Sequence, residues 1–132
     1  MESDLDELAR IVVDTSYHIH HDLGPGLLES AYEIILFELL LARGLNVERQ
    51  VPINIDYRKI QIANAFKVDL LVETKLVVEL KATENFAPVH AKQVLTYLKL
   101  MNLPLGLLIN FGAATFKEGV RRLANNHTDL AS

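Results

Sequence analysis

The sequence predicts a single α/β domain whose mixed four-stranded sheet is flanked by helices. The chain has 132 residues and half of them are apolar, which suits one core and leaves no room for a second. Its apolar spacing changes from helical to strand-like and back along the chain, so helices and strands alternate in blocks. We found no internal repeat, linker or low-complexity tract, and therefore treat residues 1–132 as one domain.

Two helices are predicted in the first third of the chain. Residues 4–22 place Leu5, Leu8 and Val12 at helical spacing among charged neighbours, and the glycines and proline of Leu23-Gly24-Pro25-Gly26 end this helix. Residues 27–43 form a second, strongly hydrophobic helix, which Gly44 closes as a C-terminal cap.

Three consecutive strands are predicted next. Residues 47–57 alternate apolar and polar side chains, and Pro52 indicates an edge strand because proline cannot donate to a ladder. Two further strands cover residues 60–72 and 76–81. The turns between the three strands are expected at Arg58-Lys59 and at residues 73–75.

The rest of the chain is expected to add a helix, a strand and a last helix. Pro88 opens the first of these helices, which runs to about Met101. The apolar run at residues 105–111 is typical of a strand covered on both faces. A terminal helix is predicted at residues 116–125.

Composition excludes several classes of protein. The chain has no cysteine, so disulfides, thiolate zinc sites and cysteine nucleophiles are excluded. It has no apolar run long enough to span a membrane and an acidic N-terminus unlike a signal peptide, so we expect a cytoplasmic protein with no membrane partner. The net charge of −4 gives no general attraction to nucleic acid.

The most informative pattern is an acidic site on the predicted hairpin of residues 60–81. Glu79 and Lys81 are two residues apart on one strand and therefore share a face. A turn centred near Thr74 places Asp69 directly opposite Glu79, with Cβ atoms about 4.5–5.5 Å apart. Two opposed carboxylates need a compensating positive charge, and Mg²⁺ suits this donor set. The alternative is a surface cluster that only solvates the strand.

The same residues resemble the signature of the PD-(D/E)XK nuclease superfamily, in which an aspartate is followed by Glu-x-Lys on the next strand. Here Asp69 precedes Glu79-Leu80-Lys81 by nine intervening residues. The segment Gly26-Leu27-Leu28-Glu29-Ser30-Ala31-Tyr32 also resembles the motif of the GxxExxY family, a branch of that superfamily. The resemblance implies a core of helix, three strands, helix and strand at about residues 24–112.

The resemblance also implies roles for individual residues. Asp69 and Glu79 would bind the metal, Mg²⁺ or Mn²⁺, and Glu29 would complete the metal site from its helix. Lys81 would orient the attacking water and stabilise charge on the scissile phosphate. For Glu29 the alternative is an ordinary carboxylate favoured by the dipole at the start of a helix.

Three further residues are expected near this site as supporting or substrate-contacting groups. Tyr32 is expected to support the site rather than to catalyse. Gln93 and Tyr97 lie four residues apart on one helix face and match a Gln-x-x-x-Tyr pattern found in some nucleases of the superfamily. They would hold Lys81 or contact substrate, and the alternative is a polar patch where the helix crosses the sheet.

The function implied by the resemblance is metal-dependent hydrolysis of phosphodiesters, with DNA as the expected partner. The rival hypothesis is a non-catalytic interaction or regulatory module that has the nuclease fold without turnover. Hydrolysis of another phosphate ester would use the same residues. Because the chain is little more than the core, substrate capture is expected to involve a homodimer or a larger complex.

Overall fold

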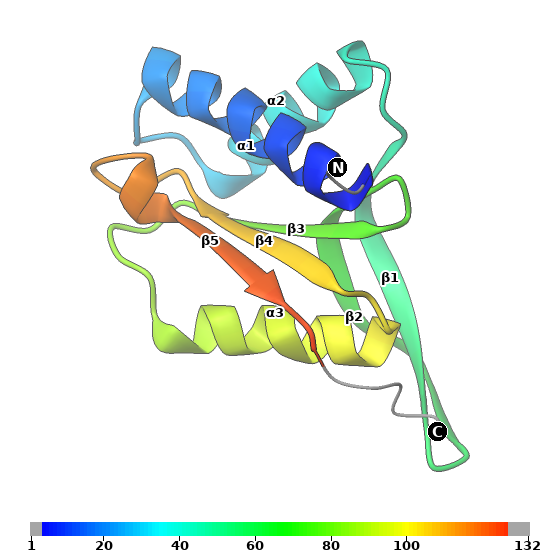
Figure 1. Cartoon of the computed structure of the whole chain (residues 1–132). Helices are drawn as coiled ribbons and strands as arrows, with labels where there is room; N and C mark the ends of the chain where they lie inside the picture. Colours follow the sequence, from blue (N-terminus) through cyan, green and yellow to red (C-terminus); the bar gives the residue numbers. More distant parts are fainter. Residues whose placement is uncertain (1–3, 127–132) are drawn as a thin grey trace.

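The computed structural model describes residues 4–126 and has three layers, with a sheet between helices (Figure 1). Two helices cover one face of the sheet and the third helix covers the other. The elements, in chain order, are α1 (Asp4–Leu23), α2 (Glu29–Ala42), β1 (Val47–Tyr57), β2 (Ile60–Val72), β3 (Leu76–Lys81), α3 (Pro88–Met101), β4 (Leu105–Asn110), η1 (Lys117–Gly119) and β5 (Val120–Ala124).

The five strands follow one another across the sheet in the order β1-β2-β3-β4-β5. Only β3 and β4 run parallel, because α3 connects them as a crossover, and the other neighbours are antiparallel. β1 lies at one edge, as the proline at position 52 indicated. The mixed sheet flanked by helices is therefore confirmed, but it has five strands and not the predicted four.

The predicted last helix at residues 116–125 is wrong. The structure has one short 3-10 turn, η1, and then β5, which pairs antiparallel with β4. Gly119 passes so close to β4 that an added Cβ would lie 2.4 Å from the carbonyl oxygen of Asn110. This contact directs the following residues along the free edge of β4, whose backbone groups need partners. Pairing with β4 outweighs the local helix propensity.

Apolar side chains form a separate core on each side of the sheet. Leu36, Leu40 and Tyr32 of α2 are fully buried against the face covered by α1 and α2. Val94 and Leu98 of α3 are buried on the opposite face. β4 is buried along its whole length, as its apolar run predicted. In the described part of the chain, no helix is long and apolar enough to cross a membrane.

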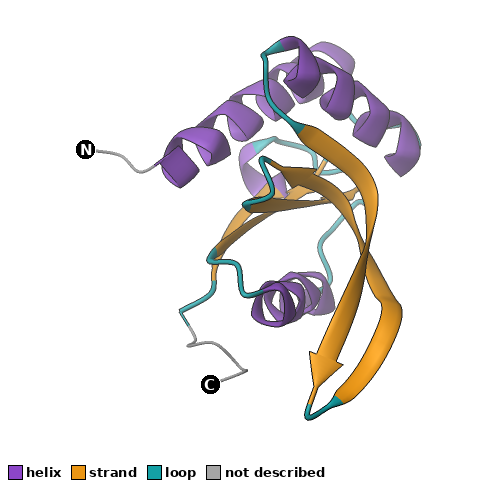
Figure 2. Cartoon of the chain, turned by 90° about the vertical axis from the view of Figure 1, so that its right-hand side faces the viewer, coloured by secondary structure: helices purple, strands orange, loops and turns teal. Residues whose placement is uncertain are grey.

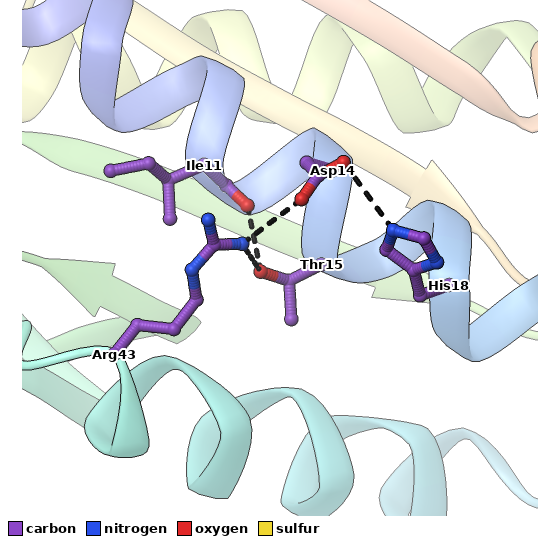
Figure 3. Close-up of polar contacts among 5 residues, drawn as sticks. All are labelled: Ile11, Asp14, Thr15, His18 and Arg43. Atoms are coloured by element: carbon purple, nitrogen blue, oxygen red, sulfur yellow. Dashed lines mark hydrogen bonds and ion pairs between the residues drawn. The ribbon is translucent and has the colours of Figure 1, made fainter.

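Polar contacts join α1 to the end of α2 (Figure 3). Nη1 of Arg43, the residue after α2, donates to Oδ2 of Asp14 at 3.1 Å and to Oγ1 of Thr15 at 2.8 Å. The Thr15 hydroxyl in turn donates to the carbonyl of Ile11 at 2.8 Å. Arg43 therefore fixes the end of α2 against the middle of α1, while the apolar faces of both helices pack on the sheet.

The hairpin of β1 and β2 extends from the edge of the sheet past α3 (Figure 2). Val47 and Leu70 belong to the core under α1 and α2, whereas Val51 and Val68 pack with α3. In a regular strand, residues separated by two or four positions lie on the same face, because the side-chain period is two. Val47 and Val51 of β1 should therefore share a face, and so should Val68 and Leu70 of β2. Both strands therefore exchange faces between these positions, next to the predicted acidic site.

Candidate functional site

The acidic pair forms where the ladder between β2 and β3 ends. The last paired residues are Leu70 and Val78, and the next position along the two strands is occupied by Asp69 and Glu79. Oε1 of Glu79 accepts the backbone N–H of Asp69 at 3.0 Å. Oδ2 of Asp69 accepts the backbone N–H of Leu80 at 2.9 Å. Each carboxylate therefore holds the opposite strand, and the register expected from a turn near Thr74 is confirmed.

Glu79 is buried, with 5% of its surface exposed, although it carries an ionisable carboxyl group. Burial raises its pKa to about 9, and the negative charge of Asp69 acts in the same direction. The neutral form of Glu79 also shares a side-chain hydrogen bond with Asp69, whereas Lys81 opposes the shift. Near neutral pH the fold therefore favours the protonated form of Glu79 in the absence of a cation.

Lys81 and Glu29 contribute charge to the same site from different elements. Lys81 ends β3, and its ammonium group favours the ionised form of both Glu79 and Glu29. Glu29 is the first residue of α2, and burial is the largest cause that raises its pKa. The negative charges of Asp69 and Glu33 raise the pKa of Glu29 further. The structure thus brings Glu29, Asp69, Glu79 and Lys81 into one electrostatic cluster.

Of the two residues predicted on α3, Tyr97 approaches the acidic pair. Burial, followed by the charges of Glu79 and Asp69, raises the pKa of its hydroxyl above the ordinary value. Its ring stacks on Phe66 of β2 with 4.0 Å between ring centroids. Gln93 is exposed one turn earlier on α3. Among residues 4–126 we find no hydrogen bond between its side chain and Lys81.

Tyr32 fixes the loop that precedes α2. Its side chain is fully buried and stacks on Phe111 at a centroid distance of 4.6 Å. The hydroxyl donates to the carbonyl of Gly24 at 2.5 Å and accepts the backbone N–H of Leu27 at 3.2 Å. Gly24 has a φ of 68°, which favours glycine at that position. Through these contacts Tyr32 sets the position where α2, and with it Glu29, begins.

Three residues of the site were missed by the sequence analysis: Glu33, Arg49 and Gln50. Glu33 is buried on α2, where its carboxylate pairs with the guanidinium of Arg49 at 3.0 Å. Nε2 of Gln50 donates to Oε1 of Glu33 at 2.7 Å and to Oδ1 of Asp69 at 3.3 Å. A glutamate at helical spacing with the buried apolar residues of α2 was the available signal, but only the fold shows which partners Glu33 meets.

The donor set fits a divalent cation. Mg²⁺ prefers hard oxygen ligands and needs only one or two carboxylates, with substrate and water at its other positions. Asp69 and Glu79 offer two such groups on adjoining strands, and a cation would offset the cost of ionising buried Glu79. Within residues 4–126 no three His, Cys, Asp or Glu side chains lie close enough to hold an ion. Glu29 as a third ligand therefore stays a prediction.

Comparison with known proteins gives one family. The model of a family described as the PD-(D/E)XK nuclease superfamily matches residues 6–123, which is most of the chain. The match includes most of α1, every element from α2 to η1 and most of β5, and it contains the acidic pair and Lys81. Searches of curated proteins and of solved structures gave no match.

Proposed function

The chain belongs to the PD-(D/E)XK nuclease superfamily, and we propose that it is a metal-dependent nuclease that hydrolyses phosphodiester bonds of DNA. One observation carries this proposal. Asp69 and Glu79 hold their two strands together through reciprocal hydrogen bonds, and Lys81 lies two residues further along β3. A domain with only a structural role could accept these two backbone N–H groups with neutral side chains, without the cost of placing two carboxyl groups opposite each other.

The residues of the site divide into binding and positioning roles. Asp69 and Glu79 would hold Mg²⁺ or Mn²⁺, with Glu29 as the proposed third carboxylate. When bound, the metal supplies Lewis acidity to the scissile phosphate and lowers the pKa of a nearby water. Lys81 places a positive charge beside the acidic pair, where it can orient that water and stabilise charge on the phosphate.

The finer parts of the proposal rest on the resemblance. We assign the chain to the GxxExxY branch on the segment from Gly26 to Tyr32, and we expect it to act in the cytoplasm. The substrate is proposed to be DNA because that is the substrate the resemblance implies. A homodimer or larger complex would enlarge the contact surface of a chain whose net charge is −4.

The test is cleavage of linear, circular and single-stranded DNA with Mg²⁺ or Mn²⁺. We expect cleavage by the natural protein and loss of it in Glu79→Ala and Lys81→Ala. Glu38→Ala, at an exposed position on α2, is the matched control and should keep full activity. Cleavage that survives both site substitutions would refute the assignment of these residues.

A non-catalytic interaction module remains the second candidate, and one observation favours it. Several apolar side chains are exposed on α2 and just before it: Leu28 is 77% exposed, Ile34 45% and Leu41 40%. Exposed apolar surface of this kind is typical of interaction sites. If calorimetry shows Mn²⁺ binding that Asp69→Ala removes, but no DNA is cleaved, this candidate replaces the nuclease.

A further inference from the structure

Gln50 has an unusual backbone conformation beside the acidic pair. Its φ is 51°, in the left-handed region that glycine and asparagine tolerate better than glutamine. The flanking pairs Arg49–Leu70 and Val51–Val68 keep one register, so Gln50 lies opposite Asp69 on the neighbouring strand. A residue held in this region within a strand costs stability, and such costs concentrate at functional sites.

The side chain of Gln50 shows what this conformation achieves. Its amide nitrogen lies between two carboxylates, 2.7 Å from Oε1 of Glu33 and 3.3 Å from Oδ1 of Asp69. Nε2 donates both hydrogen bonds, so the NH₂ group of Gln50 and not its carbonyl faces the two carboxyl groups. Glu33 is itself held from the other side, because Nε and Nη2 of Arg49 bond its Oε2 at 3.2 Å and 3.0 Å.

These contacts leave Asp69 fully constrained. Oδ1 accepts from Gln50, and Oδ2 accepts the backbone N–H of Leu80. Each carboxylate oxygen has a second lone pair, so both remain able to bind a cation while the side chain is prevented from rotating. Hydrogen bonds of this kind to a ligand carboxylate orient it and increase metal affinity.

We propose that Gln50 is a positioning residue that holds Asp69 in the orientation needed to bind the divalent cation, and that Glu33 and Arg49 fix the Gln50 amide for this purpose. The inference rests on the proposed function, because it assumes that Asp69 is a metal ligand. It predicts that the strained backbone conformation of Gln50 increases metal affinity and does not increase the stability of the fold.

The test separates the effect of Gln50 on metal binding from its effect on stability, with substitutions that relieve the backbone strain at position 50. Gln50→Gly removes the amide and favours the left-handed conformation, and Gln50→Asn favours it while the side chain is one methylene too short. Mn²⁺ affinity is measured by the spin-resonance signal of the free ion, and stability by thermal unfolding without metal. Lys59→Gly is the matched control, because Lys59 also has a positive φ, 68°, but lies at the tip of the β1–β2 hairpin.

We expect both Gln50 variants to bind Mn²⁺ about tenfold more weakly, with a melting temperature equal to or above that of the natural protein. Lys59→Gly should leave the affinity unchanged. Unchanged affinity in the Gln50 variants, when the natural protein binds Mn²⁺, overturns this inference alone. So does a parallel fall of affinity and melting temperature, which would indicate a merely structural role. A natural protein that does not bind Mn²⁺ overturns the proposed metal site and this inference with it.

Discussion

Replacing Glu79 by glutamine should stabilise the metal-free protein. Glutamine keeps the size of the neutral carboxyl group: its carbonyl can accept the N–H of Asp69, and its NH₂ group can donate to the Asp69 carboxylate. Unlike glutamate, it binds no proton. The variant therefore removes the free-energy cost of keeping a buried acid protonated at a pH where the unfolded chain would release the proton.

The size and sign of the effect follow from the pKa of Glu79, which is raised from 4.5 to about 9. Between these two values the folded state binds more protons than the unfolded state, so stability falls as pH rises through this window. Each pKa unit corresponds to about 1.4 kcal/mol, and at about pH 7 the cost reaches at most roughly 3.4 kcal/mol. Because water can relax around the site, we expect Glu79→Gln to gain about 1–3 kcal/mol at this pH.

The assay is urea unfolding in the presence of a chelator at about pH 5 and about pH 7. The gain should be below about 1 kcal/mol at the lower pH and should grow at the higher one. Glu38→Gln on the exposed side of α2 serves as the control, with no gain at either pH. A Glu79→Gln protein that is no more stable than the natural one at about pH 7 would refute the reasoning, because Glu79 would then ionise freely in the fold.

Three other perturbations test the site and its support. Binding of Mn²⁺ near neutral pH should release about one proton per ion as Glu79 ionises, measured by calorimetry in buffers of different ionisation enthalpy. A binding heat that is independent of the buffer would contradict a protonated Glu79. Tyr32→Phe removes the hydroxyl that bonds the Gly24 carbonyl, and should cost about 1–2 kcal/mol in urea unfolding, whereas an unchanged midpoint would show that this hydrogen bond adds nothing. Gly112→Ala would place a Cβ 2.3 Å from the carbonyl oxygen of Thr83. The variant should be less stable by several kcal/mol, because the backbone of one segment must move. A melting temperature within about a degree of the natural value would argue against this close approach.

The register of the acidic hairpin illustrates what could be predicted from residues close together in the chain. The short turn at residues 73–75 fixes which residues of β2 and β3 face each other, and the two-residue period of a strand puts Glu79 and Lys81 on the same face. The bounds of β1, β2, β3 and α3 agree with those expected from the sequence for the same reason, because proline, turn residues and apolar spacing act locally.

The end of the chain shows where local signals fail. Residues 116–125 have the composition of a helix, yet they form η1 and β5 because β4 offers an unpaired edge and Gly119 can approach its end. The decisive contact joins Gly119 to Asn110, and its energy belongs to both segments. Helix propensity within the segment contains no information about that edge.

The sequence by itself determined the fold class, the opposed carboxylates Asp69 and Glu79, and Lys81 beside them. Only the tertiary structure decided that Glu79 is buried and holds its proton, and that Gln50 reaches Asp69 from a neighbouring strand. The hydrogen bonds of Arg49 and Gln50 to Glu33, and of Gln50 to Asp69, join residues 16–19 positions apart on different elements. Periodicity and turn chemistry act over a few neighbouring residues, whereas burial and hydrogen bonding across strands depend on how whole elements pack.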